Sequence, residues 1–185
     1  MKRIALVTAI VSCTMLLGIG IARAEERVCR GSLGAITVDN LRVPQGATCT
    51  LQGTRVQGTV KVETNATLRA TDVRVIGNVQ AENARLVVVR RSSRVGGSIQ
   101  VVQSGGARVV GSNVQGDILF DENDRAIEAL RNTIGGNLQA FQNTGGVEIR
   151  GNQIDGNLQC KENQPRPTGG GNIVQGNKED QCARL

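Results

Sequence analysis

Residues 132–160 read NTIGGNLQAFQNTGGVEIRGNQIDGNLQC, so the phrase N-x-I-x-G-N-L-Q occurs twice, 20 residues apart. Looser copies extend in both directions, and each contains a glycine that returns after 19 or 20 residues. The seven glycines are Gly58, Gly77, Gly97, Gly116, Gly136, Gly156 and Gly176. A fixed period of this length is typical of a solenoid, in which each repeat forms one coil and packs only against its neighbours.

Aliphatic residues occupy fixed positions around each glycine. The residue two before it is always Val or Ile, and the residue two after it is Val, Ile or Leu until Lys178 in the last copy. Such alternation predicts short strands with one inward face. Further aliphatic columns, which include Leu68, Val88 and Val109, predict a second strand in each coil. We expect an all-β fold, a single-stranded parallel β-helix (solenoid) with about 20 residues per coil. Right-handed winding is favoured, because the coil is longer than in left-handed hexapeptide solenoids.

Polar residues recur with the same period and predict hydrogen-bonded ladders between coils. One column contains Asn65, Asn83, Gln103, Asn123, Asn143 and Asn163, and the other contains Ser93, Ser112, Asn132, Asn152 and Asn172. We interpret these side chains as structural and not catalytic. The repeat glycines are expected at a corner, where they permit a positive φ and close packing of the next coil.

The N-terminal segment has the pattern of a signal peptide. Lys2 and Arg3 precede an apolar run over residues 4–21, and Ala22-Arg23-Ala24 fits a cleavage site. An uncleaved membrane anchor is the alternative. We therefore predict a signal peptide over 1–24 and a solenoid domain over 25–185, with an N-terminal cap at about 25–50, coils at about 51–164 and a C-terminal cap at about 165–185. The expected location is periplasmic, cell-surface or extracellular.

Four cysteines remain after the predicted cleavage, and four cysteines allow three disulfide pairings. Cys29 and Cys49 are 20 residues apart, and Cys160 and Cys182 are 22 apart. In a solenoid these spacings place each pair on adjacent coils, so we predict Cys29–Cys49 and Cys160–Cys182, one at each end of the stack. A shared zinc site is the alternative, but the pairs are distant and the chain has no histidine. No metal or cofactor is expected.

Composition argues against several function classes. The chain has no His, Trp or Tyr and two Phe, so the commonest catalytic base and the aromatic platforms of sugar-binding clefts are missing. Its net charge of +6 becomes +3 without Lys2, Arg3 and Arg23, which is too small to indicate nucleic-acid binding. The charge is uneven. Residues 25–108 contain 12 Lys/Arg and 6 Asp/Glu, whereas residues 109–185 contain 7 Lys/Arg and 10 Asp/Glu.

Three arginines form the candidate binding site. Arg55, Arg74 and Arg94 all lie three residues before a repeat glycine, so they should stack on one outer face. Stacked like charges are unfavourable unless an anion binds them, and guanidinium groups suit carboxylate or phosphate. Further arginines in this half are Arg69, Arg85, Arg90, Arg91 and Arg108. The alternative is a solvated surface that Glu63, Asp72 and Glu82 neutralise.

An enzyme is the competing functional class, because parallel β-helices include polysaccharide lyases and hydrolases. Such a site needs converging carboxylates or a bound cation. The densest acidic stretch is Asp121-Glu122-Asn123-Asp124, which we interpret as a solvated turn.

Two further phrases carry a resemblance. They are VPQGATCTL at residues 43–51 and GNLQCKEN at residues 156–163, the latter followed by PTGGGN at 167–172 and GNKEDQC at 176–182. Over residues 36–182 the chain resembles a group of exported bacterial proteins of uncharacterised activity, built from V-x-G-N-[VL]-Q repeats. The resemblance implies a bacterial, exported β-solenoid and no particular substrate. We expect a non-catalytic envelope or surface module that binds anionic polysaccharide or lipopolysaccharide; the alternative is a degenerate polysaccharide-active enzyme.

Overall fold

The computed structural model describes residues 25–185, in which every regular element is a β-strand. The signal peptide predicted for residues 1–24 lies outside the described residues. Within residues 25–185 there is no helix of the length and apolar character needed to cross a membrane.

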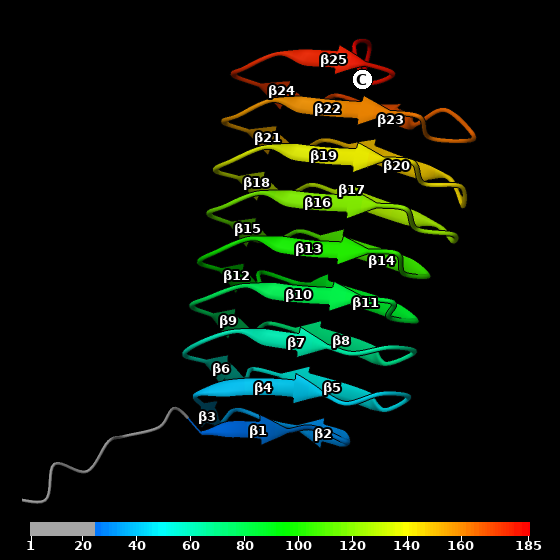
Figure 1. Cartoon of the computed structure of the whole chain (residues 1–185). Coiled ribbons are helices and arrows are strands. Elements are labelled where there is room, and N and C mark those ends of the chain that lie inside the picture. Colours follow the sequence, from blue (N-terminus) through cyan, green and yellow to red (C-terminus); the bar gives the residue numbers. More distant parts are fainter. Residues whose placement is uncertain (1–24) are drawn as a thin grey trace, which may run out of the picture.

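The strands form three parallel sheets that run the length of the molecule (Figure 1). Sheet A contains β1 (Glu26–Val28), β4 (Asn40–Val43), β7 (Val60–Val62), β10 (Val79–Glu82), β13 (Ile99–Val102), β16 (Ile118–Asp121), β19 (Leu138–Phe141), β22 (Leu158–Lys161) and β25 (Lys178–Asp180). Sheet B contains β2 (Gly31–Leu33), β5 (Thr48–Gln52), β8 (Thr67–Thr71), β11 (Leu86–Arg90), β14 (Gly106–Val110), β17 (Ile127–Leu130), β20 (Val147–Arg150) and β23 (Thr168–Gly170). Sheet C contains β3 (Thr37–Val38), β6 (Arg55–Val56), β9 (Arg74–Val75), β12 (Arg94–Val95), β15 (Asn113–Val114), β18 (Thr133–Ile134), β21 (Gln153–Ile154) and β24 (Ile173–Val174).

Each full coil supplies one strand to each sheet, and the molecule is a β-solenoid of about eight coils with roughly 20 residues per coil. In Figure 1 the strands of sheet A run from left to right in front, and the chain returns behind them while it rises from the N-terminal to the C-terminal coil. The winding is therefore right-handed, as favoured from the sequence and as usual for parallel crossovers. The aliphatic columns on either side of the repeat glycine lie on separate strands, in sheets C and A, so each coil has three strands and not two. Strands continue through both regions that the sequence assigned to caps.

The interior is filled by stacked aliphatic columns, as the sequence predicts. Phe120 is the largest fully buried side chain, and Val, Ile, Leu and Ala supply nearly all of the rest. One predicted inward residue is wrong: Val88 pairs in register with Arg69 and Arg108 and faces outward, whereas Val87 and Val89 face the core. The shift arises because this coil carries one extra residue at the Arg91-Ser92 corner.

The repeat glycines lie at the corner between sheets C and A, but the predicted positive φ is wrong, because none of the seven has one. Close packing alone requires glycine there. A Cβ on Gly156 would lie 2.5 Å from Asn137 Oδ1 and 2.7 Å from the Gly136 carbonyl oxygen. The side chain that follows each glycine explains the crowding, since it caps the backbone of the next coil; Asn137 Oδ1, for example, accepts from Asn157 N at 2.8 Å.

Two buried asparagine ladders tie the coils together at the other corners. Asn132, Asn152 and Asn172 form one ladder, and Ser93 and Ser112 extend it as predicted. The other predicted column divides into two. Asn123, Asn143 and Asn163 are buried, and Ser104 continues them toward the N-terminus. In contrast, Asn65, Asn83 and Gln103 are exposed residues with positive φ, one position earlier in the corner.

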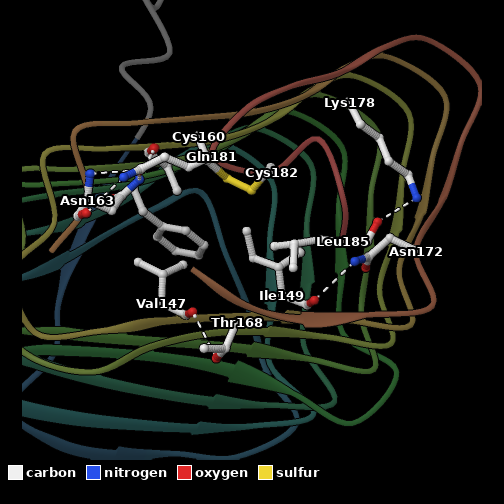
Figure 2. The surroundings of a disulfide bond; sticks show 12 residues. Val147, Ile149, Cys160, Asn163, Thr168, Asn172, Lys178, Gln181, Cys182 and Leu185 are labelled. Atoms are coloured by element: carbon white, nitrogen blue, oxygen red, sulfur yellow. Dashed lines mark hydrogen bonds between the residues drawn. A yellow bond between two sulfur atoms is a disulfide. The ribbon is translucent and has the colours of Figure 1, made fainter. Parts of the chain in front are cut away.

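Both predicted disulfides are present. Cys29 bonds to Cys49 with Cα atoms 5.6 Å apart, and Cys160 bonds to Cys182 at 5.2 Å. The partners are not directly stacked, because Cys49 is in register with Gly31 and Cys160 with Asp180. Figure 2 shows the second bond holding the C-terminal turn over the last coil.

The C-terminal turn closes that end of the core. Leu185 packs against the buried cluster, and its carbonyl oxygen accepts a hydrogen bond from Lys178 Nζ (Figure 2). Gln181 Oε1 ends the asparagine ladder by accepting from Asn163. The open strand edges of the last coil are thus partly covered, which limits end-to-end stacking.

Candidate functional site

The three predicted arginines come together as one outward column on sheet C. Arg55 of β6 pairs in register with Arg74 of β9, and Arg74 pairs with Arg94 of β12. Each arginine is the first residue of a two-residue strand whose second residue is a buried valine. Because successive side chains of a strand point to opposite faces, each arginine faces outward. Neighbouring strands lie about 4.8 Å apart, so the column spans about 10 Å along the solenoid axis.

The column has no ion-pair partner among the described residues. Arg55, Arg74 and Arg94 are exposed, and none of them takes part in an ion pair within residues 25–185. Glu63, a neutraliser in the alternative interpretation, instead contacts Arg42 on sheet A, with Nη1 and Oε1 3.6 Å apart. No ion pair joins the column to Asp72 or Glu82, the other two carboxylates of that interpretation, within residues 25–185.

The column continues toward the C-terminus with uncharged hydrogen-bonding groups. Asn113 is in register with Arg94, and Thr133 and Gln153 follow it. A shallow hollow beside the column is lined by Arg74, Arg94, Gly96 and Asn113. The surface can bind anionic groups at its basic end and donate neutral hydrogen bonds farther along.

A second group of arginines lies on a different face, the outside of sheet B. Arg69, Arg90 and Arg108 lie on β8, β11 and β14, and Arg85, Arg91, Arg125 and Arg131 lie at the ends of sheet B strands or in the adjoining loops. Arg108 is paired, with Nε 2.8 Å from Glu128 Oε2. The sequence indicated a generally basic half, but it did not separate these two faces.

The outer face of sheet A has mixed chemistry. Its hollow is lined by Lys61, Glu63, Gln80, Glu82 and Gln100, so both signs of charge are present. Gln80 Nε2 donates to Gln100 Oε1 at 3.4 Å. Leu119 interrupts the column, and beyond it Gln139 donates to Gln159 and Gln159 donates to Glu179. This face does not select for anions.

The side chains of the acidic stretch at residues 121–124 do not converge on one point. Glu122 accepts from Gln103, Asp124 lies 3.8 Å from Arg125 Nε, and Asn123 is a buried ladder residue. Burial raises the pKa of Asp121, and the neighbouring Glu122 raises it further. No cluster of three or more potential metal ligands occurs within the described range 25–185.

Comparison of the chain with protein-family models, with curated proteins and with solved structures gives no match. The fold and surfaces define a disulfide-linked parallel β-solenoid with a basic N-terminal half. Its two disulfides are typical of an oxidising, non-cytoplasmic environment.

Proposed function

We propose that this protein is a non-catalytic, exported β-solenoid that binds an anionic polymer of the cell envelope or surface. The in-register column of Arg55, Arg74 and Arg94, exposed and without ion pairs, is the single observation that carries this proposal. Like charges opposite each other on neighbouring strands destabilise a sheet. A bound polyanion would remove that repulsion.

The geometry favours a repeating ligand. Three guanidinium groups at intervals of about 4.8 Å match a chain whose carboxylates or phosphates recur at a similar spacing. Anionic polysaccharide and the phosphorylated sugars of lipopolysaccharide have such groups. Asn113 and Thr133 extend the same outer column and can donate hydrogen bonds to sugar hydroxyls.

Export is part of the proposal. The segment at residues 1–24 has the sequence pattern of a signal peptide, and the disulfides suit the environment that export would provide. The expected location is therefore the periplasm, the cell surface or the medium.

The test is equilibrium binding of the purified protein to lipopolysaccharide, a polyuronate, peptidoglycan and a neutral polysaccharide at two salt concentrations. The variant is Arg55→Ser/Arg74→Ser/Arg94→Ser, and Lys161→Ser/Arg166→Ser/Arg184→Ser is a control with the same change in net charge. All six side chains are exposed, so neither variant should disturb the core.

The proposal predicts salt-sensitive binding of an anionic polymer that the sheet C variant loses and the control keeps. Equal loss in both variants would indicate only a net-charge effect and would contradict a site. Absence of binding by the unmodified protein would refute the function.

A further inference from the structure

A groove on the outer face of sheet B combines an apolar floor with a rim of arginines. Leu86 and Val88 of β11 and Val110 of β14 form the floor. Five arginines line the same groove: Arg69, Arg90, Arg91, Arg108 and Arg131. All five arginine side chains are exposed, and four of them have no ion pair within residues 25–185; the fifth, Arg108, is paired with Glu128 of the next coil.

The floor is apolar although it faces away from the core. Val88 stands between Arg69 and Arg108 in the outward column of sheet B, and it is only 7 % exposed. The aliphatic stems of the flanking arginines can cover it while their charged ends remain in water. Arg90 is held in place by Thr71, whose Oγ1 accepts from Arg90 Nε at 3.2 Å.

Two arginines project from the corner between sheets B and C. Arg91 follows β11 and Arg131 follows β17, and Gly111 lies between them in the stack. A Cβ on Gly111 would meet no atom within 4 Å, so the glycine leaves an open notch between the two guanidinium-bearing coils. The notch adjoins Val110, at one edge of the apolar floor.

The backbone at this corner is unfavourable for arginine. Arg91 and Arg131 have φ values of 56° and 53°, and Ser92 also has a positive φ of 57°. The equivalent corner is glycine in four other coils, at Gly53, Gly111, Gly151 and Gly171, and it is Asp72, with a φ of 53°, in one more. The left-handed region costs free energy for a residue with a Cβ and is easily adopted by glycine. Because glycine fits this corner in four other coils, replacing the two arginines with glycine should not strain the backbone.

We propose that this groove is a second binding site, which takes a phosphate monoester carried on a hydrocarbon chain. The phosphate contacts Arg91 and Arg131 over Gly111, and the chain lies on Val110, Val88 and Leu86. Guanidinium groups bind phosphate oxygens in bidentate fashion. The chain covers the half-buried Leu86 and Val110, since Val88 is already nearly buried. The site is separate from the sheet C column and does not depend on the polymer-binding function.

Calorimetric titration with octyl phosphate, below its micelle concentration, tests this site in the purified protein. Inorganic phosphate and octyl glucoside are the matched probes, one without the chain and one without the charge. Arg91→Gly/Arg131→Gly removes the corner arginines, and Arg166→Ser/Arg184→Ser, at exposed residues outside both arginine surfaces, is the control with the same charge change. Val110→Thr alters the floor with little change in shape.

Octyl phosphate should bind at least about tenfold more tightly than either partial probe, because both charge and chain contribute. Arg91→Gly/Arg131→Gly should weaken it by about tenfold or more without lowering the thermal midpoint, since glycine suits the left-handed corner. Val110→Thr should weaken the binding of octyl phosphate and leave that of inorganic phosphate unchanged, and the Arg166→Ser/Arg184→Ser control should bind both normally.

Three results would each overturn the proposal. Inorganic phosphate that binds as tightly as octyl phosphate would remove any role for the floor. Full binding by the Arg91→Gly/Arg131→Gly variant would remove the role of the corner. A fall in thermal midpoint in that variant would mean that the two arginines serve the fold.

Discussion

Replacing Asn143 with alanine should be among the most damaging single changes in this molecule. Its side chain is fully buried and makes four hydrogen bonds. Nδ2 donates to the Phe120 carbonyl at 3.0 Å and to Asn163 Oδ1 at 2.8 Å. Oδ1 accepts from the backbone N of Asn123 at 3.1 Å and from its Nδ2 at 2.8 Å.

The magnitude follows from the groups left without a partner. Alanine removes the side-chain acceptor of the Asn123 backbone N–H and the side-chain donor to the Phe120 carbonyl. Each buried polar group that loses its partner costs about 1–3 kcal/mol. We expect Asn143→Ala to lower the free energy of unfolding by about 3–5 kcal/mol, a large part of the 5–15 kcal/mol typical of a domain.

The assay is denaturant unfolding with both disulfides intact, which gives the free energy of unfolding by linear extrapolation. Asn113→Ala is the matched control, since Asn113 is exposed on β15; it should change stability by less than about 0.5 kcal/mol. A loss below about 1 kcal/mol for Asn143→Ala would refute the reasoning that the buried ladder holds the coils together.

Three further changes test other parts of the structure. Gly156→Ala should cost about 2 kcal/mol or more because its Cβ would overlap the coil below, whereas Gly34→Ala, with no atom near its Cβ, should be nearly neutral in the same unfolding measurement. Cys29→Ala/Cys49→Ala should lower stability by about 3 kcal/mol, and an unchanged unfolding midpoint would show that this bond does not restrain the unfolded chain. Asp121→Asn should raise the free energy of unfolding at pH 7. Burial and Glu122 raise the pKa of Asp121 in the folded protein, so the native aspartate loses stability as the pH rises from its unfolded to its folded pKa. Asparagine cannot ionise and avoids this loss. That gain should vanish below about pH 3.9, the ordinary aspartate pKa; a gain that persists at lower pH would contradict the assignment to ionisation.

The fold could be predicted because the period places one residue of each coil above its equivalent in the next. Spacing alone therefore located the core columns, the arginine column and both disulfides. It failed where a coil changes length at a corner, because a strand shifted by one residue turns every side chain over. The extra residue at Arg91-Ser92 shifts β11 and so turns Val88 outward.

The sheet B groove was missed for the same reason. Val88 in its floor was predicted to face the core, and its arginines are scattered over several column positions. Only the position of the extra corner residue shows that Val88 and Arg91 belong to one surface. The exposed Asn65, Asn83 and Gln103 were misplaced likewise, because they precede the buried ladder by one residue in a corner of variable length.

The salt dependence of polyanion binding tests the central claim most directly. The affinity of the unmodified protein and of Arg55→Ser/Arg74→Ser/Arg94→Ser for the best polymer would be measured over a range of salt concentrations. If the sheet C column is the site, the slope of log affinity against log salt should fall by about two to three in the variant, because each guanidinium contact releases about one counter-ion. Equal slopes and equal affinities for the two proteins would contradict the claim.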